Sequence, residues 1–240
     1  MSFKTRLCTG FLFAFLFVVA YANAQQLPVN LRFDKFTTED GLSDNYVHDI
    51  IKDKQGYLWV STQNGLNRFD GVEFKTFFHD PDDSNSLLSN YVSFIVEDSL
   101  GRIWAATSGG LCVYNTITGK FRNFIPPQNK YFKSRINKVL MAHDGSIWFS
   151  TLNHISTIDL KTFSVLSYPI DSVYSETNGA AVDFFCEDHN GNFWFDSYHG
   201  LCLFDRKTHG IKMIDKNWGL SSFYDDGKGE CCHRGHERTF

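Results

Sequence analysis

The chain has 240 residues, of which 42% are hydrophobic and 16% are aromatic, and its formal net charge at pH 7 is −4. A chain of this composition can bury a core, which excludes an intrinsically disordered protein. The mildly acidic charge, without a cluster of lysines and arginines, argues against nucleic acid as a partner.

The first predicted element is an export signal over residues 1–24. Lys4 and Arg6 precede an apolar run over residues 7–21, and Ala22 and Ala24 supply the small residues of a cleavage site. The run is short for a transmembrane helix, which needs about 20 residues. We therefore expect cleavage after Ala24 and a periplasmic location. Membrane attachment would come only from an uncleaved signal or from C-terminal regions outside this chain.

Residues 25–218 contain a repeat that is marked by a glycine three residues before a tryptophan. An aspartate, a threonine or serine, and a Gly-Leu pair recur in register with most of the tryptophans. A period of about 45 residues is typical of the blades of a β-propeller. The four copies of the glycine and tryptophan are Gly56/Trp59, Gly101/Trp104, Gly145/Trp148 and Gly191/Trp194.

Each copy is predicted to form four short strands, which in the first copy are residues 46–52, 58–62, 66–69 and 73–77. The first of these is rich in β-branched and aromatic residues, as expected for a strand buried on both faces. The tryptophans are expected to pack between blades rather than to serve as platforms for sugars. The predicted fold class is all-β, with four complete four-stranded propeller blades and a partial one.

Residues 219–240 are predicted to be an atypical, truncated fifth repeat or a disordered tail. Asp226 and Gly229 keep the turn spacing of the other copies, but Cys232 stands where the tryptophan belongs. We expect no inner strands from this segment. An outer strand is predicted over residues 31–36, and it would then have no inner strands with which to complete a last blade. The predicted propeller is therefore incomplete, with two bare blade faces, and the isolated chain is expected to be unstable, oligomeric or prone to aggregate.

The repeated pattern resembles the two-component regulator propeller repeat. The resemblance is clearest over residues 53–70 and 98–115, where aspartate, glycine, tryptophan, threonine and Gly-Leu recur together. In that family, such propellers form the periplasmic sensor region of hybrid histidine kinases, and characterised members commonly sense breakdown products of polysaccharides. The resemblance implies an extracytoplasmic sensor of oligosaccharides whose intact parent is a homodimeric sensor histidine kinase, whereas this chain has no kinase core.

Two sets of polar residues are candidates for a ligand surface. One set shares the position eleven residues before each tryptophan, on the innermost strand, and consists of His48, Ser93, Asn137 and Asp183. The other set lies in the loops that lead into these strands and mixes aromatic with hydrogen-bonding groups, as sugar sites do: Asn45, Tyr46, Asn90, Tyr91 and Arg135. The alternative for each asparagine is a purely structural loop hydrogen bond.

The sequence contains no nucleophile elbow, dinucleotide fingerprint or P-loop, so we predict no catalysis and no cofactor. No metal site is predicted either, because Cys231, Cys232, His233 and His236 match no zinc spacing. Two alternatives to a sensor remain open. One is a propeller enzyme of the glycan lyase or hydrolase type, with side chains gathered from several blades around the axis. The other is a structural, protein-binding propeller.

Overall fold

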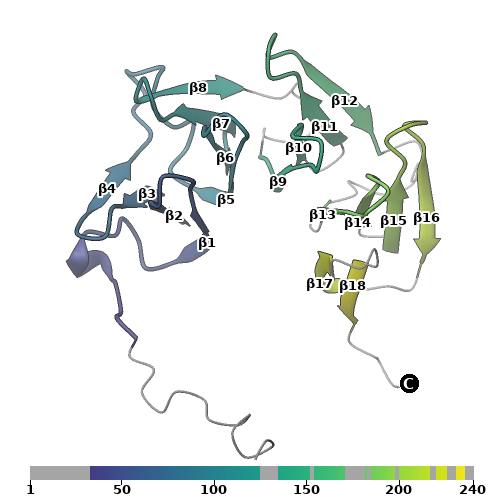
Figure 1. The fold of residues 1–240 in the computed structure, drawn as a ribbon, viewed down its shortest axis with the longest axis horizontal. Coiled ribbons are helices and arrows are strands. Elements are labelled where there is room, and N and C mark those ends of the chain that lie inside the picture. The colour runs from purple at the N-terminus through teal and green to yellow at the C-terminus, as the bar shows by residue number, and fades with distance from the viewer. Residues whose placement is uncertain are drawn as a thin grey trace, which may run out of the picture. The chain divides into compact units, whose positions relative to one another are not determined.

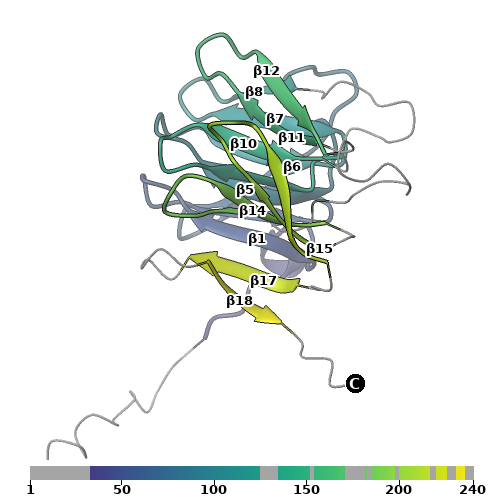
Figure 2. The same cartoon turned by 90° about the vertical axis from the view of Figure 1, so that its right-hand side faces the viewer.

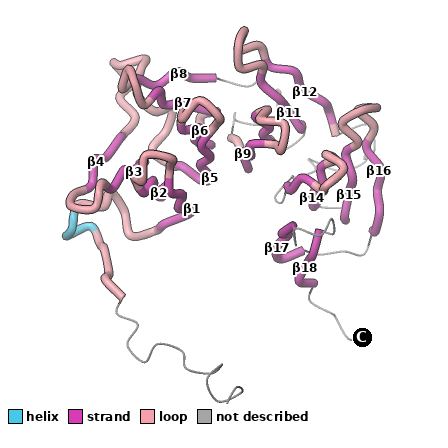
Figure 3. The backbone as a smooth tube through the Cα atoms, viewed as in Figure 1, coloured by secondary structure: helices cyan, strands magenta, loops and turns pink. Residues whose placement is uncertain are grey.

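The computed structural model describes residues 33–124, 135–151, 154–170, 182, 185–197, 200–216, 220–225 and 231–235. The predicted export signal lies outside these residues. The chain divides into two units, residues 1–36 and 37–240. In the first unit, residues 33–36 form no strand, so the outer strand predicted to include them is wrong there. The second unit opens with a 3₁₀ helix, Thr38–Asp40, and its described residues are otherwise strands and loops (Figure 3).

The strands from residue 47 to residue 215 form four antiparallel sheets of four strands, each in chain order (Figure 1). Blade 1 consists of β1 (Val47–Lys52), β2 (Leu58–Thr62), β3 (Gly65–Phe69) and β4 (Phe74–Phe77). Blade 2 consists of β5 (Val92–Glu97), β6 (Ile103–Thr107), β7 (Gly110–Asn115) and β8 (Lys120–Phe124). Blade 3 consists of β9 (Lys138–Met141), β10 (Ile147–Ser150), β11 (His154–Ile158) and β12 (Val165–Pro169). Blade 4 consists of β13 (Phe185–Glu187), β14 (Phe193–Ser197), β15 (Gly200–Phe204) and β16 (Ile211–Asp215).

A single aspartate organises the turn between the first two strands of blade 1. Asp53 Oδ1 accepts hydrogen bonds from the backbone N–H groups of Gln55 and Tyr57, and its Oδ2 accepts one from Trp59 Nε1 at 2.7 Å. Gly56 has a φ of 97°, which is left-handed backbone that favours glycine. The repeated Asp-x-x-Gly-x-x-Trp pattern is therefore one hydrogen-bonded unit.

The same unit recurs in two of the other blades and is replaced in the remaining one. Asp98 Oδ2 accepts from Trp104 Nε1 at 2.8 Å, and Asp188 Oδ2 accepts from the tryptophan of blade 4 at 2.9 Å. Blade 3 has Ala142 at the aspartate position, and there Trp148 Nε1 donates to Ser146 Oγ at 2.8 Å. The indole N–H of each of these four tryptophans thus has an acceptor, as a buried donor requires.

Three apolar clusters lie between consecutive blades rather than within them. Trp59 of blade 1 lies against Tyr114 of blade 2, with ring centroids 5.4 Å apart. Trp104 packs with residues of blade 3 such as Phe149, and Trp148 packs against Phe193 of blade 4. The prediction that the tryptophans pack between blades is confirmed for these three.

The first strand of blade 1 differs from its equivalents. Val47 and Ile50 are 41% and 58% exposed, whereas the matching Val92 and Ile95 of blade 2 are 0% and 1% exposed. The expectation that residues 46–52 form a strand buried on both faces is therefore wrong for blade 1. The reason is tertiary, because blade 1 covers β5 of blade 2, whereas no described blade precedes blade 1.

Residues of the C-terminal segment form a further antiparallel pair, β17 (Leu220–Asp225) and β18 (Cys231–Gly235) (Figure 2). Tyr224 pairs with Cys232, just as Ile51 pairs with Trp59 in blade 1. Cys232 therefore takes the place of the tryptophan in the register, and the expectation that this segment forms no inner strands is wrong. The described residues make an incomplete propeller, as predicted, which has four blades and two strands of a fifth. Within these residues, no helix has the length and apolar character needed to cross a bilayer.

Candidate functional site

Five of the nine predicted ligand-site residues line one cavity of about 250 Å³. His48 lies on β1 of blade 1, Ser93 on β5 of blade 2, and Asn137 immediately before β9 of blade 3. Tyr91 and Arg135, from the loops that lead into the innermost strands, line the same cavity. Three equivalent positions of the repeat thus meet, together with two of the predicted loop residues.

Tyr91 is the aromatic centre of this cavity. Its ring centroid lies 4.9 Å from that of His48, and the two rings are tilted by 49°. The Arg135 guanidinium carbon lies 5.2 Å from the Tyr91 ring centroid, within the range of a cation–π contact. Arg135 Nη2 also donates to the Tyr91 hydroxyl at 3.4 Å. The tyrosine therefore holds both basic side chains at the cavity.

The two remaining polar residues of the cavity have different roles. Ser93 is buried. Its hydroxyl donates a shared hydrogen bond to the Ala106 carbonyl at 3.3 Å and to the Ile136 carbonyl at 3.4 Å. Asn137 Nδ2 donates to the Val182 carbonyl at 3.3 Å, whereas its Oδ1 accepts no hydrogen bond from the described residues. Ser93 therefore ties neighbouring blades together, and Asn137 retains an acceptor for a ligand.

A second cation lies near the apolar wall of the cavity. Phe94 lines the cavity, and Lys138 Nζ lies 4.7 Å from the Phe94 ring centroid. Burial lowers the pKa of Lys138, and the Asp49 carboxylate opposes that effect. Asp49 Oδ2 also accepts from the Ile95 backbone N–H at 3.0 Å, so this carboxylate serves the contact between blades 1 and 2.

Three further predicted site residues, Asn45, Tyr46 and Asn90, do not line the cavity. Asn45 Oδ1 accepts from the Thr38 backbone N–H, and Asn90 Oδ1 accepts from the His79 backbone N–H at 2.7 Å. These are the structural loop bonds that were the alternative for both asparagines. Tyr46 is 71% exposed, and Asp183 lies outside the described residues.

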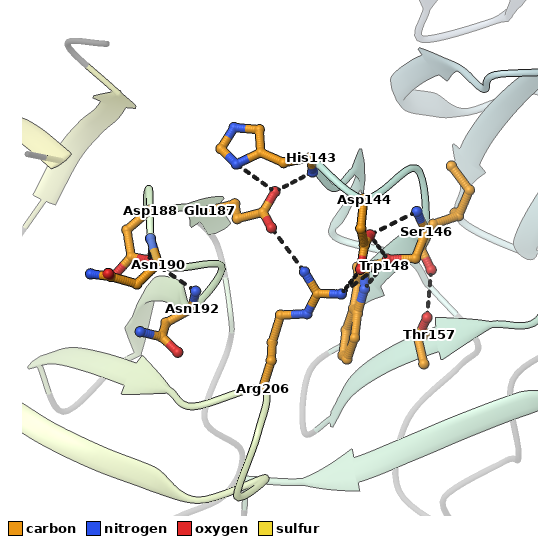
Figure 4. Close-up of polar contacts among 11 residues, drawn as sticks. His143, Asp144, Ser146, Trp148, Thr157, Glu187, Asp188, Asn190, Asn192 and Arg206 are labelled. Atoms are coloured by element: carbon orange, nitrogen blue, oxygen red, sulfur yellow. Dashed lines mark hydrogen bonds and ion pairs between the residues drawn. The ribbon is translucent and has the colours of Figure 1, made fainter. Parts of the chain in front are cut away.

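A polar cluster that the sequence did not reveal joins blades 3 and 4 (Figure 4). Arg206 follows β15, and its Nη1 donates to Glu187 Oε1 at 2.8 Å while its Nη2 donates to Asp144 and Ser146. Glu187 Oε2 accepts from the His143 backbone N–H at 2.6 Å. Glu187 is 8% exposed, so this cluster binds the two blades together through a buried carboxylate.

The sequence did contain a signal for part of this cluster, because Glu97 and Glu187 stand at the same repeat position. Glu97 Oε2 accepts from the Lys54 backbone N–H at 3.0 Å, which is the same contact at the interface between blades 1 and 2. Blade 3 has Met141 at this position, 40% exposed. A larger cavity of about 990 Å³ lies there, lined by Met141 and Ser99 among other residues. In the described parts of the chain, no three His, Cys, Asp or Glu side chains gather as metal ligands would.

The sheets, the inter-blade clusters and the repeated turn define the class of this protein as a β-propeller. Residues 41–64 and 86–109 match the two component regulator propeller family. These two segments contain the repeat of that family, one at the start of blade 1 and one at the start of blade 2.

The relatives extend far beyond the length of this chain. A stretch of 58 residues is 52% identical to Histidine kinase P4 of Formosa agariphila, and it covers 24% of this chain and 4% of that protein. The structure is similar to the extracellular domain of a protein named as a hybrid two component system from B. thetaiotaomicron. This match has a TM-score of 0.71 and 25% identity, and it covers 83% of this chain and 29% of that one.

A virginiamycin B lyase from Staphylococcus aureus is also similar in structure, with a TM-score of 0.62 and 16% identity. That match covers 81% of this chain and 64% of the lyase chain. At this level of identity, the similarity concerns the propeller fold alone.

Proposed function

We propose that this chain is the extracytoplasmic, ligand-sensing propeller of a hybrid two-component regulator, and that it detects oligosaccharides derived from polysaccharides. The observation that carries the proposal is the cavity at which His48, Ser93 and Asn137 meet, because equivalent positions from three blades converge there. The similarity to the extracellular domain of a hybrid two component system supports the regulator assignment. The export signal predicted over residues 1–24 supports delivery to the periplasm.

The composition of the cavity suits one ring of a sugar. A volume of about 250 Å³ is slightly smaller than the roughly 300–1,000 Å³ of most small-molecule pockets. Tyr91 offers an aromatic face, and Arg135 and Asn137 offer donors and an acceptor for hydroxyl groups. A chain of sugars would place one unit in this cavity and leave the others outside it.

The cavity also offers a way to convert binding into a signal. Its lining comes from three blades, so a ligand that contacts His48, Tyr91 and Arg135 ties blades 1, 2 and 3 together. A ligand shifts a conformational equilibrium only when it binds one state better than another. A ligand that bridges the blades would bind best to the state in which the blades are held together. The remainder of a homodimeric parent would transmit this change of state.

The alternative of a propeller lyase or hydrolase has less support. Glycoside hydrolysis commonly uses a pair of carboxyl groups. The described residues that line the cavity include one histidine and no carboxylate. The alternative of a purely structural propeller predicts no small-molecule ligand at all, so a binding experiment separates it from a sensor.

Titration calorimetry of the purified chain against a panel of polysaccharide-derived oligosaccharides tests the proposal. Tyr91→Ala removes the aromatic face, and we expect the affinity for any bound oligosaccharide to fall at least about tenfold, which corresponds to about 1.4 kcal/mol. Tyr57→Ala is a matched control, because Arg68 stacks on Tyr57 at 4.4 Å outside the cavity. Absence of binding by every oligosaccharide, or equal binding by the wild type and Tyr91→Ala, would contradict the proposal.

A further inference from the structure

Some arginines of this protein pair with carboxylates, whereas the arginine at the cavity pairs with none that the structure describes. Arg102 pairs with Asp98, and Arg206 pairs with Asp144 and Glu187. Arg135, by contrast, is exposed and forms no ion pair with any described residue. A guanidinium group presents a planar fork of donors that matches the geometry of a carboxylate or a sulfate. Arg135 therefore has the capacity to bind an anion.

Tyr91 holds this guanidinium group in place. Its ring lies under the Arg135 guanidinium carbon, and its hydroxyl accepts one Arg135 hydrogen bond. This stacking uses the face of the guanidinium plane and leaves most of the N–H groups at its edge for a ligand. A side chain that is already ordered loses less entropy on binding, so the arrangement favours affinity.

The rest of the lining favours negative over neutral ligands. The described residues of the cavity include the basic side chains of His48 and Arg135 and no carboxylate. Lys138 also lies next to the Phe94 wall, where the Asp49 carboxylate interacts with it. Neutral sugars present hydroxyl groups that donate as well as accept, whereas carboxylates and sulfates only accept. The N–H groups of Arg135 therefore suit an acceptor-only group best.

We infer that the sugar unit bound in this cavity is acidic and that Arg135, stacked on Tyr91, binds its carboxylate or sulfate group. This inference rests on the proposed function, because it specifies the chemistry of the ligand at the same site. It also assigns separate tasks to the two side chains. Tyr91 recognises the sugar ring and orients Arg135, and Arg135 selects for charge.

The test compares ligands of the same size that differ in charge. The full chain is titrated with digalacturonic acid, with its neutral dimethyl ester and with a sulfated disaccharide that has no carboxylate. We expect at least one of the two anionic probes to bind at least about tenfold more tightly than the neutral ester. Arg135→Gln is expected to abolish that preference, so that the anionic probes bind no more tightly than the neutral ester does. Whichever anionic probe binds better identifies the group as carboxylate or sulfate.

Two further variants provide the controls. Arg122→Gln removes a stacked arginine that lies 4.0 Å from the Phe163 ring centroid and outside the cavity, so the preference for anions should persist. Arg135→Lys keeps the charge but loses the planar fork, and it should retain only part of the preference. This second change at residue 135 keeps the test decisive if the glutamine variant fails to fold.

The outcomes separate this inference from the proposed function. Equal affinity for the acid, the sulfated probe and the ester overturns the inference and leaves the oligosaccharide sensor intact. A preference for anions that survives in Arg135→Gln also overturns it, because another group would then select for charge. If the chain binds no oligosaccharide of any charge, the proposed function fails and the inference fails with it.

Discussion

The aspartate of the blade 2 turn offers a sharp test of how the repeat is held together. Asp98 is fully buried and accepts hydrogen bonds from the Leu100 and Arg102 backbone N–H groups, from Arg102 Nε at 2.6 Å and from Trp104 Nε1 at 2.8 Å. Asp98→Ala removes the acceptor oxygens of all four hydrogen bonds. It leaves a buried indole donor unpaired and an arginine, whose side chain is 12% exposed, without its counter-charge.

The expected loss is large for a single substitution. Removing one partner of a buried ion pair costs about 3–5 kcal/mol, and an unpaired buried donor costs about 1–3 kcal/mol. Because the effects share one site and do not add, we expect the free energy of unfolding to fall by about 4 kcal/mol. For a chain of this size, that corresponds to a decrease in the melting temperature on the order of 10 °C.

Urea unfolding followed by tryptophan fluorescence and circular dichroism measures the effect. Asp70→Ala is the control, because the exposed Asp70 carboxylate accepts from the Val72 and Glu73 backbone N–H groups in a turn without a tryptophan partner. The control should lose much less stability. Equal and small losses in the two variants would refute the argument that the buried aspartate holds the turn.

Three further predictions concern other parts of the repeat. In Gly110→Ala the new Cβ would lie 2.5 Å from the Phe124 carbonyl oxygen, whereas in Gly56→Ala it meets no heavy atom within 4 Å. Both positions have positive φ, so thermal melts should show a lower melting temperature for both variants, and the clash should make the decrease larger for Gly110→Ala. Equal decreases would disprove the clash. Met141→Glu should place a carboxylate at the Ser99 backbone N–H, as Glu97 does for blade 1, and raise the stability by about 1 kcal/mol. An unchanged melting temperature would contradict this. Burial raises the pKa of Asp188, but hydrogen bonds, chiefly from Trp194, outweigh it and hold this pKa below its ordinary value of 3.8. The stability that Asp188 contributes is therefore complete above pH 3.8 and lost as the pH falls through the lower folded pKa. Melts in acid should show a smaller decline in Asp188→Asn, and an identical decline would exclude this carboxylate as a cause.

The sequence by itself determined the local structure of each blade. The strand predicted over residues 58–62 is β2 with the same bounds, because the turn chemistry of Asp53 and Gly56 is contained within a few residues. The repeat also predicted that His48, Ser93 and Asn137 would share one location. Equivalent positions of a repeat occupy equivalent places in successive blades, so a period of about 45 residues carries spatial information.

Only the tertiary structure decided the features that depend on a neighbouring blade. Ile50 and Ile95 occupy the same repeat position, yet they are 58% and 1% exposed, because blade 1 covers the second and no described blade covers the first. Arg206 of blade 4 reaches Asp144 of blade 3, a contact between residues 62 positions apart that no local pattern encodes. The polar sequence of the C-terminal segment predicted no inner strands, yet β17 pairs with β18. Local patterns specify hydrogen bonds within a blade, whereas burial and ion pairing arise when separate blades meet.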